Sequence, residues 1–224
     1  VAFNLAFKDF DLDWYWNEKK YLKLLEISGG LNRIIHYRDE IFSELTNDTC
    51  IEIQSRKSFY YKKLIHSGKI EVRKGVLRLI EELSKFNIDQ YIVTTSGRES
   101  LNPFLQTSLN LHMKFFSNVI TFEDVTNHKP FPDAYNLAVK LSNKSSLNCL
   151  VIEDSTIGIE AARSAGIKSL LTLPPWTDGS QNISYNANAC VDTLGDNEQF
   201  SNLIYGKPLV NNIVDFAYLR NIIN

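Results

Sequence analysis

Residues 149–158 have the sequence Cys-Leu-Val-Ile-Glu-Asp-Ser-Thr-Ile-Gly, and this stretch indicates the fold of the whole chain. It opens with an apolar run that is too short for a helix and has the length of a buried strand. Two carboxylates, Glu153 and Asp154, follow at once, and a helical pattern of small residues comes after them. Ser155 is suited to the N-cap of that helix. The stretch therefore predicts a strand that ends in two acids and leads into a helix.

The rest of the chain divides into two parts at about residue 72. From residue 73 on, helical patterns alternate with short apolar runs at 91–93, 117–121, 169–173 and 189–191. Such alternation predicts an α/β fold with a parallel sheet flanked by helices. Residues 1–72 have helical patterns and no β-type alternation, which predicts a small helical domain at 1–72 and an α/β domain at 73–224. The early aromatic residues are expected to form the core of the helical domain; they are Phe3, Phe7, Phe10, Trp14, Tyr15, Trp16 and Tyr21.

Composition excludes several classes of partner. The 224 residues carry a net charge of −2 with an isoelectric point near 6.1, which argues against a broad nucleic-acid or membrane surface. No apolar stretch approaches the roughly 18 residues of a membrane span. The three cysteines are widely spaced and form no CxxC pair, so we expect reduced thiols, an intracellular location and no structural zinc.

The two adjacent carboxylates are the first candidate site. Ligands of open parallel sheets bind outside the carboxyl ends of the strands, where Glu153 and Asp154 are predicted to lie. Carboxylates at such a position suit Mg²⁺, with phosphate and water completing its octahedron. An ordinary strand-to-helix turn with acids near the helix N-terminus explains the pair equally well. Taken alone, the acidic pair leaves both interpretations open.

Two further polar features follow predicted strands. Thr94 comes after the strand at 91–93, and its hydroxyl, together with a loop closed by Gly97, could cradle a phosphate. Lys129 stands before two prolines, and a lysine ammonium neutralises phosphoryl oxygens well. In isolation each feature fits a hydrophilic turn or an exposed lysine. Jointly with Glu153 and Asp154 they predict a site for Mg²⁺-assisted phosphoryl transfer.

These residues together resemble the haloacid dehalogenase superfamily of phosphohydrolases. Thr94 matches its second motif, Lys129 in Lys-Pro-x-Pro-Asp its third, and the segment 152–166 its fourth. Within the superfamily the chain is most similar to the beta-phosphoglucomutase-like branch, and there to the CbbY-like phosphatases. This narrower resemblance rests on residues 2–7, 13–16, 28–34 and 94–96.

The resemblance implies a Rossmann-like catalytic core and a helical cap domain that closes over a small phosphorylated substrate. It assigns Thr94 and Lys129 to the transferring phosphoryl group, Arg33, Ser96, Gly97 and Arg98 to the substrate, and Glu153 and Asp154 to Mg²⁺. For Arg33 and Arg98, a role as solvated surface charges stays open.

One motif of the family has no counterpart in the 224 residues. The family's nucleophilic aspartate lies in Asp-x-Asp-Gly-Thr, whereas the Asp-x-Asp runs here, at residues 9–13, neither follow an apolar strand nor precede Gly-Thr. We therefore expect the native polypeptide to continue upstream of Val1, with the nucleophile on the strand at the centre of the sheet. The 224 residues alone are expected to be inactive, because they lack a covalent nucleophile.

The sequence thus predicts a Mg²⁺-dependent phosphatase for a small sugar phosphate, for which the resemblance suggests xylulose-1,5-bisphosphate. A phosphosugar mutase and a catalytically silent binding module remain alternatives. The expected partner is a small phosphorylated sugar, with no nucleic acid and no membrane, and the expected state is a monomer. The expected location is the cytoplasm, or the plastid stroma in a photosynthetic eukaryote.

Overall fold

A computed structural model describes residues 1–25, 27, 29–175 and 186–224. The chain forms two compact units, one of Val1–Glu71 with Thr95–Leu109 and one of Val72–Thr94 with Asn110–Asn224. The first boundary falls one residue before the predicted one. The segment 95–109 groups with the helical unit, whereas the predicted division assigned it to the α/β domain. The roles of cap and catalytic core for these units stay predictions.

The first unit is built from helices. Their bounds are Ala2–Asp9 for α1, Glu18–Leu24 for α2, Gly30–Glu40 for α3, Asn47–His66 for α4 and Arg98–Thr107 for α6. Helix α4 begins where the Thr46 hydroxyl accepts a hydrogen bond from the Thr49 backbone N–H at 3.1 Å. Such a cap satisfies an N–H group that has no partner inside the helix. Helix α3 begins after Gly29, whose φ of +86° is one that glycine adopts without strain.

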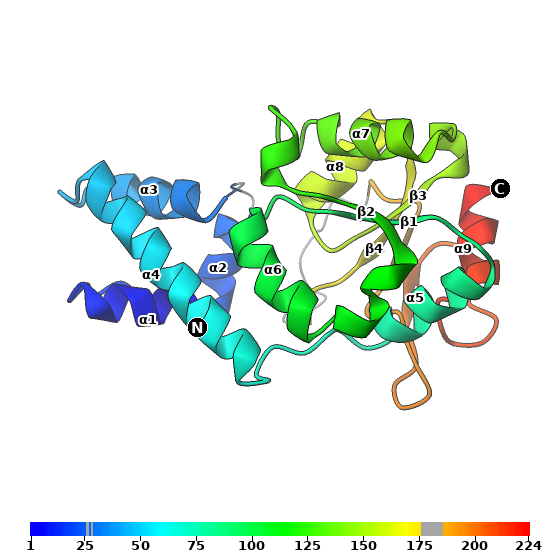
Figure 1. Ribbon diagram of the computed structural model, residues 1–224, viewed down its shortest axis with the longest axis horizontal. Coiled ribbons are helices and arrows are strands. Elements are labelled where there is room, and N and C mark those ends of the chain that lie inside the picture. Colours follow the sequence, from blue (N-terminus) through cyan, green and yellow to red (C-terminus); the bar gives the residue numbers. More distant parts are fainter. Residues whose placement is uncertain (26, 28, 176–185) are drawn as a thin grey trace. The chain divides into compact units, whose positions relative to one another are not determined.

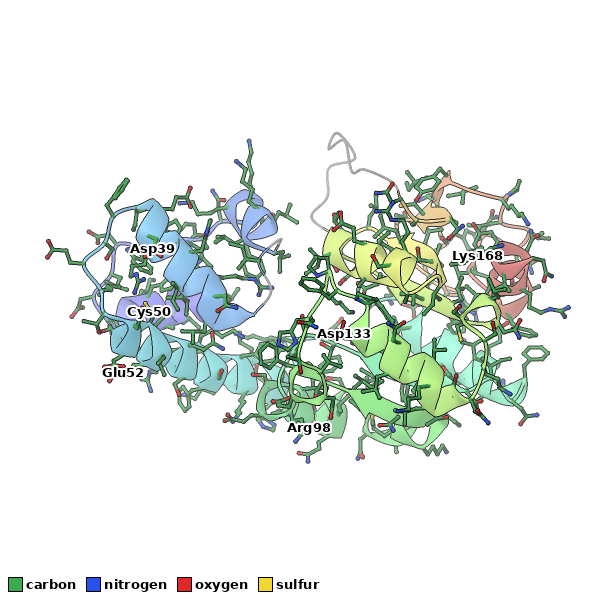
Figure 2. All side chains as sticks on the ribbon, turned by 90° about the horizontal axis from the view of Figure 1, so that it is seen from above. Asp39, Cys50, Glu52, Arg98, Asp133 and Lys168 are labelled. Carbon is green, nitrogen blue, oxygen red and sulfur yellow. The ribbon has the colours of Figure 1, made fainter. Side chains whose placement is uncertain are left out.

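An aromatic core holds the first unit together. Phe3 and Phe7 lie on one face of α1 and contact Trp16, with ring centroids 4.6 and 4.9 Å from it. Cys50 on α4, labelled in Figure 2, is fully buried. Most of the predicted aromatic cluster belongs to this core. Tyr15 does not, because it is 66% exposed while its neighbours in sequence point inward.

The second unit contains all the strands of the described residues. The strands are Gln90–Val93 (β1), Phe116–Ile120 (β2), Leu150–Glu153 (β3), Lys168–Thr172 (β4), Ala189–Val191 (β5) and Leu203–Tyr205 (β6). Strand β1 pairs with β2, and β3, β4, β5 and β6 form a second sheet in that order. All these pairings are parallel except β5 with β6, which sequence analysis did not predict. Within the described residues β1 and β3 each pair along one edge only, so a strand between them would join the two sheets.

Helices cover both faces of the sheet that contains β4. The helices of this unit are Val76–Lys85 (α5), Asp133–Ser142 (α7), Thr156–Ser164 (α8) and Phe216–Ile223 (α9), with short 3₁₀ turns at Asn110–Phe115, Phe122–Asp124 and Ser146–Asn148. Neighbouring side chains of a strand point to opposite faces. Leu170 accordingly packs in a cluster with residues of α5 and α9, and Leu171 in one with Ile159 of α8. Helices α7 and α8 lie beside each other (Figure 1). The predicted α/β fold is confirmed.

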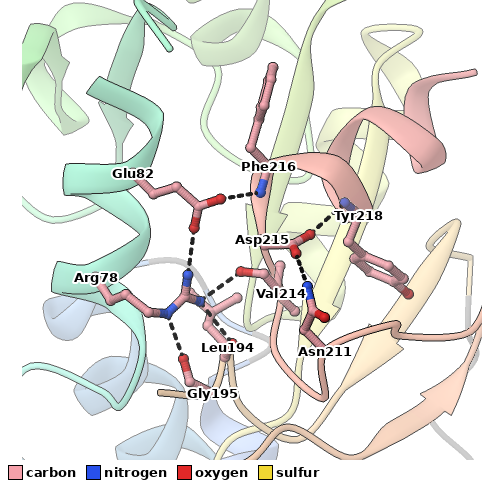
Figure 3. Close-up of polar contacts among 9 residues, drawn as sticks. All are labelled: Arg78, Glu82, Leu194, Gly195, Asn211, Val214, Asp215, Phe216 and Tyr218. Carbon is pink, nitrogen blue, oxygen red and sulfur yellow. Dashed lines mark hydrogen bonds and ion pairs between the residues drawn. The ribbon is translucent and has the colours of Figure 1, made fainter. Parts of the chain in front are cut away.

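A partly buried arginine attaches α5 to the C-terminal part of the second unit. Figure 3 shows the Arg78 guanidinium donating to three backbone carbonyls, those of Leu194 (3.2 Å), Gly195 (3.0 Å) and Val214 (2.7 Å). Arg78 also pairs with Glu82 at 2.7 Å, and Glu82 accepts the Phe216 N–H at 2.8 Å. Asp215 caps α9 by accepting the Tyr218 N–H. These contacts hold α5 against residues 194–195 and 214–216 of its own unit.

Candidate functional site

The carboxyl end of β3 carries the two acids as the sequence predicted. Ser155 caps α8, because its hydroxyl accepts the Gly158 N–H at 3.2 Å. Position 158 requires glycine, because a Cβ there would lie 2.1 Å from the Glu153 carboxylate carbon. The absent side chain lets α8 begin directly against Glu153. The turn therefore sets the position of the first acid.

The Glu153 carboxylate is buried and surrounded by donors. Its residue is 9% exposed. Oε1 accepts from the Lys129 ammonium and from the Tyr135 hydroxyl. Oε2 accepts from the Ser155 hydroxyl at 3.0 Å and from the Asp154 backbone N–H at 3.2 Å. Both oxygens of this buried carboxylate therefore have hydrogen-bond partners.

Lys129 connects the ends of β1 and β3. It is 6% exposed, and its ammonium donates to the Val93 carbonyl at 3.0 Å as well as to Glu153. The ammonium also lies 4.8 Å from the centre of the Tyr135 ring. Burial is the largest cause that raises the pKa of Tyr135 well above its ordinary value, and the Glu153 carboxylate is the second. The Tyr135 hydroxyl therefore stays protonated and donates. The lysine predicted from the third motif thus meets the acid predicted from the fourth.

Thr94 follows β1 at the same end of the strands. Its backbone N–H donates to the Ile120 carbonyl at 2.9 Å, which extends the pairing of β1 with β2 by one residue. Val93, the residue before it, supplies the carbonyl that Lys129 contacts. Thr94, Lys129 and Glu153 therefore come from chain positions far apart and are placed around two strand ends of one unit.

Asp154 differs from Glu153 in its surroundings. The residue is exposed, whereas Glu153 is buried. Partial loss of solvent is the largest cause that raises the pKa of Asp154, and the Glu153 carboxylate is the second. Arg73 and Lys129 oppose this rise. Arg73 is itself held by the Thr172 hydroxyl at 3.0 Å, and that hydroxyl donates to the Glu153 carbonyl at 3.2 Å. Asp154 is thus the more accessible of the two acids.

The two acids fit a Mg²⁺ ion that takes its remaining ligands from outside these residues. Mg²⁺ is typically held by one or two carboxylates together with phosphate and water. The described part of the chain contains no group of three or more His, Cys, Asp or Glu side chains that could hold a metal ion. Glu153 and Asp154 are therefore a partial ligand set, which a phosphorylated substrate, water or a further carboxylate would complete.

The predicted substrate residues belong to the first unit. Gly97 precedes α6, and Arg98 is its first residue (Figure 2), with Ser96 just before them. Arg33 lies on α3, and its Nε donates to the carbonyls of Leu24 and Ile27 at 2.9 and 2.8 Å. The catalytic and metal residues belong to the second unit. The predicted division of labour between the two sets remains a prediction.

A second cation, which was not predicted from the sequence, lies close to Arg33. Lys57 on α4 lies over the rings of Phe3 and Tyr61, 5.2 and 5.1 Å from their centres. Burial is the largest cause that lowers the pKa of Lys57 to about 8, and the repulsion by Arg33 is the second. The sequence offered only a spacing signal, since Lys57 follows the apolar Ile53 by four residues and so shares its face of α4.

One buried acceptor of the first unit has no partner among the described residues. It is Gln54 Oε1, which a Cβ on Gly30 would approach to 2.5 Å. Burial also lowers the pKa of Arg33. The first unit thus encloses two partly desolvated cations and an unpaired amide oxygen.

The Asp-x-Asp runs at residues 9–13 lie in the helical unit. Asp9 ends α1 and pairs with Arg56 and Tyr60 of α4. These side chains of the first unit hold the Asp9 carboxylate and lower its pKa, with Arg56 as the largest cause. Among the described residues, those just before these aspartates form α1 and no strand.

Comparison with known proteins defines the class. Residues 1–172 match the family of haloacid dehalogenase-like hydrolases, and the chain belongs to this family. Within the family it is similar to CbbY proteins. The plasmid-encoded CbbY of Cupriavidus necator is 31% identical over 201 residues, which cover 87% of this chain and 78% of that protein.

Solved structures agree with this assignment. The crystal structure of CbbY from Rhodobacter sphaeroides in complex with phosphate has a TM-score of 0.76 at 24% identity, covering 86% of this chain and 85% of that one. A mutant of the same protein in complex with xylulose-(1,5)bisphosphate has a TM-score of 0.76 at 25% identity, with 87% of both chains covered. The suspected resemblance to CbbY-like members is confirmed. No helix of the described residues has both the length and the apolar character to cross a membrane.

Proposed function

We propose that this protein is a Mg²⁺-dependent phosphatase that hydrolyses a small sugar phosphate. The buried ion pair of Lys129 and Glu153, which links the ends of β1 and β3 beside the exposed Asp154, carries this proposal. It concentrates one cation and two carboxylates where a parallel sheet binds its ligands. Phosphoryl transfer depends mainly on positioning and charge neutralisation, which these groups supply.

Each residue has a role in this proposal. The Thr94 hydroxyl donates to an oxygen of the transferring phosphoryl group, and the Lys129 ammonium neutralises another. Asp154, with Glu153 behind it, holds Mg²⁺, which when bound screens the phosphate charge and orients the phosphoryl group. In this proposal the phosphoryl acceptor is the aspartate of the family motif, carried on a strand that would pair with the edges of β1 and β3 that no described strand occupies. Water then hydrolyses the aspartyl-phosphate.

The substrate class that we propose is a pentulose bisphosphate. The binding of xylulose-(1,5)bisphosphate by a CbbY mutant supports this choice. A bisphosphate needs a second anion site, and Arg33 with Lys57 offers two partly buried cations in the first unit. Ser96, Gly97 and Arg98 would border the substrate next to Thr94 in the chain. The helical unit thereby acts as the specificity domain.

Phosphate release from a panel of pentulose and hexose phosphates tests the proposal. The assay compares the 224-residue chain with the full-length protein, each with and without Mg²⁺. Mg²⁺-dependent release by the full-length protein alone would support both the phosphatase and the upstream nucleophile. A bisphosphate intermediate without net phosphate release would indicate a mutase. Inactivity of both forms on every substrate would indicate a binding module.

A further inference from the structure

The hydroxyl of Tyr135 contacts the same carboxylate oxygen as Lys129. Tyr135 lies on α7, is 4% exposed, and donates to Glu153 Oε1. Oε2 of that carboxylate is engaged by Ser155 and by the Asp154 N–H. Four donors thus contact the two oxygens of the Glu153 carboxylate, which stabilises one orientation of this side chain. Glu153 is therefore fixed in place by contacts from three different segments.

This arrangement determines where the Lys129 ammonium can donate. An ammonium has three N–H donors. Among the described residues, two of them are directed to the Val93 carbonyl and to Glu153 Oε1. The third is left for an oxygen of an incoming phosphoryl group. If Glu153 turned away, the ammonium would lose the contact that sets this direction.

We propose that Tyr135 is a positioning residue, which holds Glu153 Oε1 against Lys129 and so directs the third ammonium N–H to the phosphoryl group. The inference rests on the proposed function and goes beyond it, because it separates the roles of the two acids. Glu153 serves chiefly to orient Lys129. Asp154, which is exposed, faces the cation.

Tyr135→Phe in the full-length protein tests this role. The substitution keeps the ring that packs beside Lys129 and removes only the hydroxyl. A hydrogen bond to a charged group typically contributes about 1.5–3 kcal/mol, so kcat should fall about tenfold or more. The Mg²⁺ concentration for half-maximal rate should change less than about twofold. Tyr205→Phe, which loses a hydroxyl contact to the Ala187 carbonyl in the same unit, is the matched control.

A binding measurement gives a readout that is independent of turnover. Inorganic phosphate should raise the melting temperature of the wild type and of Tyr205→Phe, and should do so less for Tyr135→Phe at equal concentration. The rise caused by Mg²⁺ alone should be the same in all three proteins. Glu153→Asp, whose shorter side chain cannot reach Lys129 and Tyr135 together, should show the same defect. If Tyr135→Phe does not fold, the phosphate response of Glu153→Asp tests the positioning role in its place.

The outcomes separate this inference from the proposed function. Wild-type kcat and phosphate response in Tyr135→Phe would overturn the positioning role, as would a raised Mg²⁺ requirement with unchanged phosphate binding. A wild type that releases no phosphate from any substrate but binds phosphate would refute the phosphatase, and the melting temperatures would still decide the role of Tyr135. A wild type that neither hydrolyses nor binds phosphate would refute both.

Discussion

Lys129 and Glu153, which are 24 residues apart in the chain, form an ion pair whose side chains are only 6% and 8% exposed. Breaking a buried pair leaves one charge unpaired in a medium that solvates it poorly. Lys129→Met should therefore lower the free energy of unfolding by about 3–5 kcal/mol. Urea denaturation measures this difference.

An exposed pair of the same residue types serves as the control for that experiment. The side chains of Lys62 and Glu99 are 36% and 83% exposed, so Lys62→Met should cost less than about 1 kcal/mol. Adding Glu153→Gln to Lys129→Met should recover part of the loss, because no buried charge is then left unpaired. Equal costs for the two lysine variants would show that burial does not govern the stability of the pair.

Asp154→Asn should reduce activity and weaken the dependence on Mg²⁺. The amide keeps the size of the side chain and removes the negative charge that a hard cation prefers. We expect phosphate release to fall by about a hundredfold or more, with a higher Mg²⁺ concentration for half-maximal rate. Steady-state assays over a range of Mg²⁺ measure both quantities. Asp89→Asn, at an exposed position of the same unit, is the control, and near-normal rates for Asp154→Asn would contradict the metal assignment.

Arg33→Ala should change substrate preference more than catalysis. If Arg33 binds the far end of a bisphosphate, its loss raises KM for that substrate and spares a small generic phosphate ester. Arg56→Ala removes an exposed positive charge from the same unit and should affect neither substrate. Both variants are compared with the wild type on both substrates, below their melting temperatures. An equal loss on the two substrates would exclude a role confined to specificity.

Lys57 should give the protein a specific pH dependence of stability. Its pKa falls from 10.5 to about 8 on folding, so between these values the unfolded state binds more protons than the folded state. The free energy of unfolding contributed by this group must then rise with pH across that window. The free energy of unfolding of Lys57→Met should therefore exceed that of the wild type most below about pH 8. This gain should shrink toward pH 10. Urea denaturation of both proteins at several pH values measures the gain, and a constant difference would argue against a buried ammonium.

Gly158→Ala should destabilise the protein although alanine usually favours helices. In an exposed helix interior the change from glycine to alanine gains about 1 kcal/mol. Here the new Cβ would lie 2.1–2.4 Å from the atoms of the Glu153 carboxylate, which would have to move away from Lys129. We expect a lower melting temperature and a lower kcat. Ser164→Ala, at an exposed position of the same helix, should leave both unchanged, and a stabilised Gly158→Ala would refute the close contact.

The sequence determined the local features of this protein. The apolar run and small-residue helix around Glu153 predicted β3, α8 and the Ser155 cap, because strand length and capping depend on neighbouring residues. It also placed Thr94, Lys129 and the two acids after predicted strands. Tyr15 was assigned wrongly to the aromatic core, since side-chain direction in an irregular segment has no period from which it could be predicted.

Only the tertiary structure decided which of these residues meet. Tyr135 and Lys57 carry no recognisable motif, and their positions depend on the packing of α7 and α4 against distant segments. The different surroundings of Glu153 and Asp154, one buried among four donors and the other exposed, arise from the approach of α8 through Gly158. The grouping of residues 95–109 with the helical unit has the same origin, because burial and charge pairing depend on contacts between residues far apart in the chain.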